Sequence, residues 1–313
     1  MTTPAGGQLV PPVGLPDEAK VVGAGPRTPD LAGGGNRWIS RTALHTILIL
    51  VSIIWLLPTV ALLVSSFRPA NEVLTNGWWN AFKLPFEFTL DNYTDVLSKN
   101  NMALSFLNSL FITIPATVIP ILVAAYAAYA FAWMNFPGRN ILFILVVGLL
   151  VIPLQSVLIP VLQFTTSIGL TGEFAAVWLA HTGFGLPFAI FLLRNFFGAL
   201  PREMFESAYL DGASPTTAFF RLVLPLSVPA IASLVIFQFM FVWNDLLVAL
   251  ILVGGTPTVA PMTVTIANLV NSLGQGYHLL TAAAFISMAL PLVVFFGLQR
   301  FFVRGILGGS VKG

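Results

Sequence analysis

The sequence contains no cysteine, and only 8% of its 313 residues are charged. The absence of cysteine excludes disulfides, thiol nucleophiles and thiolate metal sites. Soluble globular domains have about 25% charged residues, so this chain has too few charges to solvate the surface of a soluble protein. Because 57% of its residues are hydrophobic, the composition indicates an integral membrane protein.

Sequence motifs for nucleotide chemistry and catalysis are also missing. There is no G-x-x-x-x-G-K-[ST] phosphate loop, no G-x-S-x-G motif and no carboxylate dyad within the apolar runs. His45, His181 and His278 are scattered without carboxylates at ligand spacing, which favours packed or interfacial imidazoles over a metal or catalytic site. No Lys/Arg cluster exceeds two neighbours, so nothing indicates nucleic-acid binding.

Long apolar runs fill most of the remaining sequence. Each is long enough for a helix that crosses the hydrocarbon core of a bilayer, which takes about 20 residues. We therefore predict an all-α integral membrane protein with six transmembrane helices. The predicted spans cover about residues 43–65, 104–133, 141–162, 174–196, 228–253 and 280–302.

Prolines lie well inside the second, third and fourth of these spans. Each proline lacks a backbone N–H and frees a carbonyl that needs a partner from protein or water. Such breaks fit helices that bend around a cavity, and they equally fit simple packing kinks. The prolines are Pro115, Pro120, Pro153, Pro160 and Pro187.

The ends of the chain differ from its middle. Residues 1–36 are rich in Pro, Gly and Ala and are predicted to form a disordered tail, and residues 37–313 form the predicted transmembrane domain. Six spans place both termini on one side of the membrane. With the N-terminus inside, only Arg68, Lys83 and Lys99 of the fourteen Lys and Arg fall outside, which favours cytoplasmic termini.

A polar stretch separates the fourth and fifth predicted spans, at residues 197–227, and is called the polar loop below. Gly212 fits the left-handed position that ends a helix, because glycine adopts this conformation freely. Ser214-Pro215 fits the N-cap and first position of a second helix, which Leu224-Pro225 is predicted to end. Two short helices joined by a glycine turn suit docking onto a soluble partner, although an ordinary surface loop has the same geometry.

The run LPREMFESAYLDGASPTTAFFRLVLPLSVP in the polar loop resembles the EAA loop of ABC-importer permease subunits. Glu206, Ala208 and Gly212 match its E-x-A-x-x-x-G core, and Leu224-Pro225 matches the downstream L-P. Ser207 replaces the second letter of EAA, which is a mild departure. The match is specific because several residue types recur at fixed spacing over about thirty positions.

Further segments look like the carbohydrate branch of these permeases, in particular the six-span maltose-type subunits, over residues 40–313. They are FLNSLFIT, AAYAFAWMNFPGRN, FAIFLLRNFF, FVWNDLLVALIL and FFVRGILGGSVKG. The resemblance implies the type I ABC importer permease fold in a bacterial cytoplasmic (inner) membrane. It also implies a second homologous permease subunit, two ATPase subunits and an extracytoplasmic sugar-binding protein or lipoprotein as partners. This chain itself is expected to bind no cofactor, because ATP and Mg bind in the ATPase.

The resemblance further implies that the polar loop contains a coupling helix, which the ATPase subunits move as a rigid lever. Glu206 is expected to make a polar contact in an ATPase groove where Ala208 and Tyr209 pack, while Gly212 allows the turn. The C-terminal tail is a further expected contact of the ATPase pair. The predicted coupling residues are Glu206, Ala208, Tyr209, Asp211, Gly212, Leu224 and Pro225.

Asp245 is the one carboxylate inside a predicted apolar span. A charge within the membrane is costly and normally faces a cavity or a partner. Trp243, Asn244 and Asp245 are therefore candidates for the substrate pathway, because an aromatic face, an amide and a carboxylate suit a polyol. Gln238 is a weaker candidate of the same kind. A structural hydrogen bond between subunits, or a position near the outer interface, would explain Asp245 equally well.

The preferred interpretation is a permease subunit of an ATP-driven, binding-protein-dependent importer of an oligosaccharide, disaccharide or polyol derivative. The chain is not expected to be an enzyme, because no catalytic constellation is present. The alternative is a stand-alone proton-coupled secondary carrier. Such a carrier needs buried titratable groups along its path, for which only Asp245 qualifies, and no inverted repeat of broken helices is evident.

Overall fold

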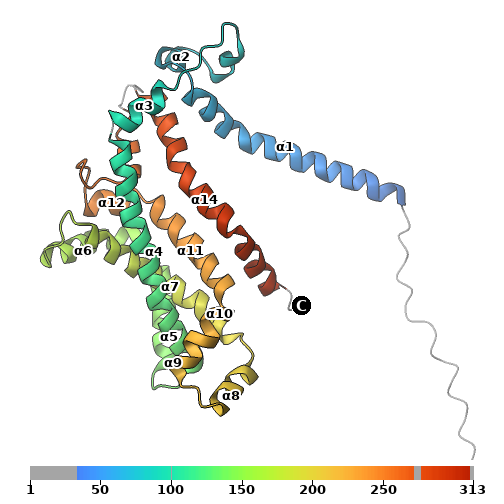
Figure 1. The fold of residues 1–313 in the computed structure, drawn as a ribbon, viewed down its shortest axis with the longest axis vertical. Helices are drawn as coiled ribbons and strands as arrows, with labels where there is room; N and C mark the ends of the chain where they lie inside the picture. Colours follow the sequence, from blue (N-terminus) through green and yellow to red (C-terminus); the bar gives the residue numbers. More distant parts are fainter. Residues whose placement is uncertain (1–33, 100, 271–275, 311–313) are drawn as a thin grey trace, which may run out of the picture. The chain divides into compact units, whose positions relative to one another are not determined.

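The computed structural model describes residues 34–99, 101–270 and 276–310. These residues form helices and turns, with no strand among them (Figure 1). The chain divides into two units, residues 1–56 and 57–313. Residues 1–33 of the predicted tail lie outside the described residues, and α1 begins at Gly34, within the range predicted for that tail.

The helices follow one another with short connections. They are α1 (Gly34–Ser66), α2 (Ala70–Thr75), the 3₁₀ helix η1 (Trp78–Phe82), α3 (Asp91–Ser98), α4 (Met102–Trp133), α5 (Arg139–Gly148), the 3₁₀ turn η2 (Leu149–Val151), α6 (Leu154–Ser167), α7 (Phe174–Gly198), α8 (Arg202–Leu210), α9 (Pro215–Ala218), the π turn η3 (Phe219–Val223), α10 (Leu224–Leu226), α11 (Val228–Trp243), α12 (Leu247–Leu252), α13 (Met262–Ala267) and α14 (Tyr277–Ser310).

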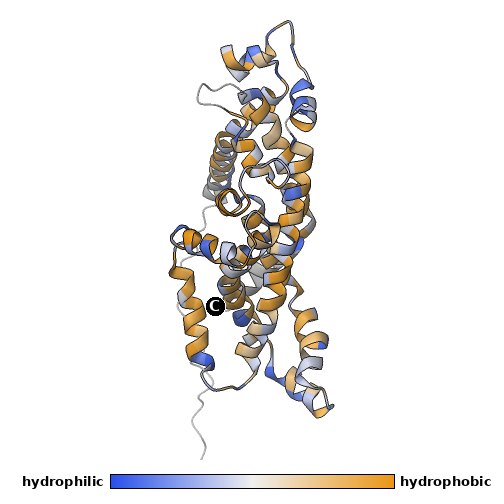
Figure 2. Ribbon diagram, turned by 90° about the vertical axis from the view of Figure 1, so that its left-hand side faces the viewer, coloured by the Kyte–Doolittle hydropathy of each residue, from blue (hydrophilic) through white to orange (hydrophobic). Residues whose placement is uncertain are grey.

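Four helices are individually long and apolar enough to cross a membrane, namely α1, α4, α7 and α14. Two more spans are bent pairs: α5 with α6, and the helical stretch 215–226 with α11. Counted this way, the described residues contain the six predicted spans. In Figure 2 the long helices are mostly hydrophobic, and hydrophilic residues gather in the connecting segments.

The third span is broken at Pro153, as predicted, but Pro160, the second break predicted within residues 141–162, lies inside the continuous helix α6. Its two halves, α5 and α6, meet at an angle of 104°. Ile152 has extended backbone angles and Pro153 caps α6. The physical reason is that proline disfavours the helical conformation in the residue before it.

The fifth span differs from the single helix predicted for residues 228–253, because α11 ends at Trp243 and α12 begins at Leu247. The Asp245 carboxylate accepts hydrogen bonds from the backbone N–H groups of Val248 and Ala249, at 3.3 and 3.0 Å. Aspartate side chains compete in this way with the backbone carbonyls that would continue a helix. Asp245 therefore starts a new helix in the middle of the apolar run.

The core lies where α4 packs along α7 and where α11 packs against both α4 and α14. On α4, Ala116, Ala124 and Ala128 are completely buried. Small side chains let transmembrane helices approach closely, which gains dispersion energy where no hydrophobic force acts between helices. The alanine-rich stretch of α4 is thus used for tight helix packing.

The segment from residue 244 to 268, called the return segment below, contains α12 and α13 and packs on the N-terminal part of α4. Asn108 donates from Nδ2 to the carbonyl of Ala260 at 3.1 Å, and Ser109 Oγ accepts from the backbone N–H of Met262 at 2.8 Å. Ser105 and Thr265 pair through their hydroxyls at 2.6 Å. A polar stripe along α4 thereby holds the return segment at one end of that helix.

Candidate functional site

The first helix of the polar loop, α8, is anchored by one buried aromatic side chain. Phe205 is 1% exposed and its ring stacks on Trp133 at the end of α4, with ring centroids 3.6 Å apart and an angle of 22° between the planes. It is the one buried residue of α8. The helix therefore docks by one edge and presents the rest of its surface outward.

The turn after α8 has the geometry that the sequence predicts. Gly212 has φ +80°, in the left-handed region that glycine occupies without a steric penalty. Its N–H donates to the carbonyl of Tyr209 at 3.1 Å, and the N–H of Ala213 donates to the carbonyl of Ala208 at 2.9 Å. This pair of bonds is the Schellman motif, which satisfies carbonyls at the end of a helix.

The start of α9 also agrees with the sequence. Ser214 Oγ accepts from the backbone N–H of Thr217 at 3.2 Å, and Pro215 occupies the first turn. The predicted end at Leu224-Pro225 is wrong, because the helix continues through α10 and breaks at Ser227 with a bend of 74°. The π turn η3 ends at Val223, two residues before Pro225. The N–H of Leu224 bonds the carbonyl of Phe219, five positions earlier, and this bond keeps Leu224 at helical angles although a proline follows it.

Further bonds fix the polar loop to the C-terminal part of α4. Tyr129 Oη donates to the carbonyl of Pro215 at 3.0 Å, and Trp133 Nε1 donates to the carbonyl of Phe197 at 3.0 Å. The Tyr129 ring also packs on Phe219, with centroids 5.2 Å apart. The polar loop thus lies at the opposite end of α4 from the return segment, as Figure 1 shows.

Most predicted coupling residues lie on the outer surface of the polar loop. Glu206 is exposed, with 66% of its side chain accessible, and its nearest charged group is Arg202 at 3.9 Å. Tyr209, Asp211, Gly212 and Pro225 are exposed, while Ala208 and Leu224 are partly buried. Beside them, Leu210 is 89% exposed. A carboxylate, a phenol and an aliphatic side chain together form a mixed surface of the kind that a protein partner covers.

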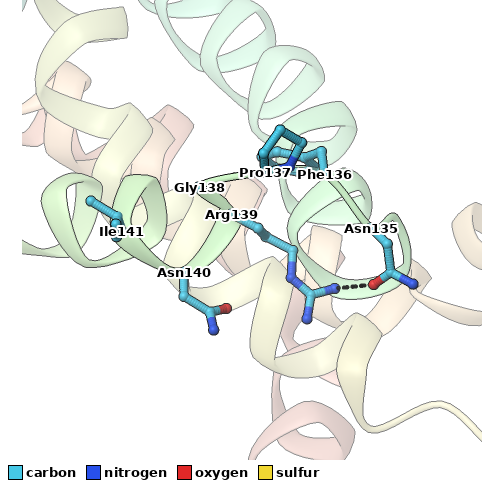
Figure 3. A pocket seen from close by; sticks show the side chains of 7 residues that line it. All are labelled: Asn135, Phe136, Pro137, Gly138, Arg139, Asn140 and Ile141. Atoms are coloured by element: carbon cyan, nitrogen blue, oxygen red, sulfur yellow. Dashed lines mark hydrogen bonds between the residues drawn. The ribbon is translucent and has the colours of Figure 1, made fainter.

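A hollow of about 570 Å³ lies at the turn between α4 and α5 (Figure 3). It is lined by seven consecutive residues, 135–141. Arg139 donates from Nη1 to the carbonyl of Met134 at 3.0 Å and to Oδ1 of Asn135 at 3.3 Å, so its side chain folds back on the turn. Because its lining comes from one turn, this hollow has no converging groups from different helices and is not the candidate site.

Two of the four predicted substrate-pathway residues are buried in this chain's own core. Trp243 is 3% exposed and donates from Nε1 to the carbonyl of Ser287, and Gln238 is 5% exposed and donates from Nε2 to the carbonyl of Ala116, both at 3.1 Å. Neither side chain is open to a solute. Asn244 is exposed, and Asp245 is partly buried and engaged in capping α12.

Sequence reasoning missed the surroundings of His181. This side chain is fully buried, and its Nε2 lies 3.5 Å from Oδ2 of Asp245. No sequence signal could have found the pair, because the two residues are far apart in the chain, one in α7 and the other between α11 and α12. Within the described residues, no group of three or more His, Cys, Asp or Glu could hold a metal ion.

The fold defines a class of helical membrane proteins in which an exposed polar loop is docked at one end of a long apolar helix. Residues 120–308 match the family described as binding-protein-dependent transport system inner membrane component. The chain belongs to this family. It is accordingly a permease component of an ABC transport system.

Relatives and solved structures agree with this assignment. The chain is 58% identical over 275 residues to the osmoprotective compounds uptake permease protein GgtD of Synechocystis sp., covering 87% of this chain and 92% of the relative. It is 55% identical over 234 residues to the alpha-glucoside transport system permease protein AglG of Rhizobium meliloti, covering 73% and 62%. A bacterial ABC transporter that imports alginate has a chain of the same fold, with a TM-score of 0.72, 18% identity and coverage of 86% and 98%.

Proposed function

We propose that this chain is one permease subunit of an ATP-driven importer for a sugar or a polyol derivative. The observation that carries this is the exposed surface of α8, which includes Glu206 and Tyr209, together with the E-x-A-x-x-x-G spacing that ends in a left-handed glycine. Its relatives are named for osmoprotective compounds and alpha-glucosides. An alpha-glucoside is a sugar derivative, which supports the proposed substrate class.

In the proposed mechanism, a binding protein delivers the solute to the side of the return segment. A related alginate transporter has been solved in complex with a periplasmic protein that carries an alginate pentasaccharide. Two ATPase subunits bind the polar loops of this chain and of a second permease subunit, with both termini in the cytoplasm. They hold ATP and Mg, and their closure moves α8 and α9.

The rigidity of the docked loop supports this mechanism. The Phe205–Trp133 stack and the bond from Tyr129 to Pro215 tie α8 and α9 to α4. The stretch 215–226 continues through one bend into α11. A displacement of the loop would therefore move α4 and α11 directly, because, in the described residues, no flexible linker separates the loop from these helices.

The test uses the transporter assembled from this chain, its partner permease and the ATPase subunits. Glu206→Lys reverses the exposed charge of α8, and Gly212→Pro removes the N–H bonded to Tyr209 and forbids φ +80°. Both variants should insert in the membrane but lose ATP-driven uptake and retention of the ATPase during purification. Glu173→Lys, at an exposed position before α7, is the matched charge reversal and should behave as wild type. Normal uptake in both loop variants would reject the proposed coupling.

The alternative, a proton-coupled carrier that works alone, is favoured by one observation, the buried His181–Asp245 pair. Against it, both carboxylate oxygens of Asp245 already accept backbone N–H groups of α12. Reconstitution of this chain alone in proteoliposomes distinguishes the two functions. Uptake driven by a proton gradient without ATPase subunits would establish the carrier and overturn the importer.

A further inference from the structure

Prolines in α4 and α14 leave backbone carbonyls without their helical donors, and side chains from other helices donate hydrogen bonds to these carbonyls. In an α-helix the N–H of each residue bonds the carbonyl four positions earlier, so a proline leaves that carbonyl without its usual donor. Three such carbonyls each accept a hydrogen bond from a side-chain N–H of a different helix. The sets of proline, freed carbonyl and donor are Pro115, Phe111 and Trp178 at 3.0 Å; Pro120, Ala116 and Gln238 at 3.1 Å; and Pro291, Ser287 and Trp243 at 3.1 Å.

These bonds satisfy a strict requirement of the membrane interior. A backbone carbonyl that lacks a partner in hydrocarbon is costly, and prolines are tolerated in transmembrane helices when neighbouring helices supply the missing donor. The three distances lie in the normal range for N–H···O bonds. Each donor also reaches the one carbonyl in the turn that the proline has freed.

The side-chain amide of Gln238 occupies space that a side chain at Gly185 would fill. Its amide also lies 3.4 Å from the carbonyl of His181, so it joins α4, α7 and α11. A Cβ on Gly185 would lie 2.6 Å from Gln238 Oε1, which is closer than real Cβ contacts come. The absence of a side chain at Gly185 therefore allows the amide to reach Ala116.

Trp243, the other side chain of α11 that donates to a freed carbonyl, bonds α14 instead of α4. Trp243 lies in the last turn of α11, donates to α14, and stacks its ring on Phe239 with centroids 5.6 Å apart. Gln238, earlier on the same helix, donates to α4. Thus α11 is bonded through side chains to both of the long spans beside it, and its N-terminal end is continuous with the polar loop.

We infer that Gln238 and Trp243 are positioning residues for transport, which carry movement of the polar loop through α11 into α4 and α14. This inference rests on the proposed function, because it presumes that ATPase subunits move the loop. The prolines leave a carbonyl available at each contact. The side chains of Gln238 and Trp243 donate to these free carbonyls, and each hydrogen bond links two helices rigidly.

The decisive experiment distinguishes two roles of these donors: linking two helices during transport, or only providing a hydrogen bond to a buried carbonyl. Gln238→Met and Trp243→Phe remove the donor but keep a side chain of similar size. Each is combined with its own proline change, Pro120→Ala or Pro291→Ala, which restores a backbone N–H to the freed carbonyl. The readouts are thermal stability of the assembled transporter, and solute taken up per ATP hydrolysed in proteoliposomes.

We expect each donor variant to lower both stability and the uptake-to-ATP ratio, the ratio by about threefold or more, as expected for one lost hydrogen bond in a low-dielectric core. The matched proline change should recover stability but leave the ratio low, because the link between helices stays broken. The crossed combinations, Gln238→Met with Pro291→Ala and Trp243→Phe with Pro120→Ala, should recover neither. Gln163→Met and Trp79→Phe, at exposed positions, serve as controls and should match wild type.

Two results would overturn the inference. Recovery of the uptake-to-ATP ratio together with stability would mean that the donors only satisfy carbonyls. A ratio that never falls in the donor variants would mean that α11 carries no movement through these contacts. Failure of the proposed function itself is distinguishable, because the wild-type assembly would then show no ATP-driven uptake at all.

Discussion

The polar loop and the return segment are both polar interruptions between apolar helices, at opposite ends of α4, but they use their polar groups differently. In the return segment, the polar groups around the starts of α12 and α13 are bonded within the chain. Asp245 caps α12, and Asn108 and Ser109 of α4 bond the backbone around α13. The polar loop leaves Glu206 and Asp211 exposed on its surface.

The difference teaches how to interpret a polar residue in an apolar sequence. When a polar group is hydrogen-bonded within the chain, that bond is sufficient reason for a polar residue at this position, because a buried donor or acceptor must be satisfied. A polar group that the fold positions but leaves exposed is available to a partner. By this criterion we propose the polar loop as the interaction site, whereas the bonded polar groups of the return segment belong to the internal structure. Four substitutions test the contrast, from the largest expected effect to the smallest.

Phe205→Ala should have the largest effect, because it removes the buried anchor of α8. Loss of a large buried aromatic side chain costs about 3 kcal/mol or more. We expect the polar loop to undock, with faster proteolytic cleavage around residues 199–214 and loss of uptake. Met204→Ala, at an exposed position of the same helix, is the control. Unchanged cleavage in Phe205→Ala would show that the loop is held by other contacts.

Asp245→Ala should have the next largest effect, on the return segment. It removes the acceptor for two N–H groups of α12, and loss of a helix cap costs about 1–2 kcal/mol. Unfolding in detergent should show this loss, while binding of the ATPase subunits is retained. Asp245→Asn keeps one oxygen acceptor and should lose less. If Asp245→Ala instead released the ATPase, the division between the two regions would be wrong.

Tyr129→Phe should have a smaller effect, confined to the polar loop. The variant keeps the ring on Phe219 but loses the bond to the Pro215 carbonyl, which is worth about 1 kcal/mol. Cleavage of the loop should rise moderately, between that of wild type and Phe205→Ala. Hydrogen exchange in α9 provides an independent measurement. An effect as large as that of Phe205→Ala would make the hydroxyl the principal anchor.

Arg202→Ala should have the smallest effect on stability. It breaks an exposed pair with Glu206 at 3.9 Å, and surface pairs of this kind contribute about 0–1 kcal/mol. Thermal stability should match wild type within about 0.5 kcal/mol of unfolding free energy. A clear loss would mean that the pair fixes the conformation of α8, so that the polar groups of the loop would be structural after all.

Several features of the fold follow from the sequence because their causes are local. The left-handed Gly212 and the capping by Ser214 depend on backbone sterics and neighbouring residues, and both appear as predicted. The predicted break of the third span at Pro153 is confirmed, whereas the predicted continuity of the fifth span was wrong. Pro153 breaks the third span because a proline disfavours helical angles in the residue before it, which is a local effect. Asp245 breaks the fifth span because its carboxylate, and not a backbone carbonyl, accepts the N–H groups at the start of α12.

Sequence alone determined that this is a helical membrane protein and where its exposed polar loop lies, since hydrophobic length and turn chemistry are encoded in contiguous residues. Only the tertiary structure decided which polar residues are used internally. Gln238 and Trp243 suggested a solute path in sequence, but each bonds a carbonyl freed by a proline on another helix. The physical reason is that a hydrogen bond between helices depends on how distant segments align, and no local pattern records that alignment.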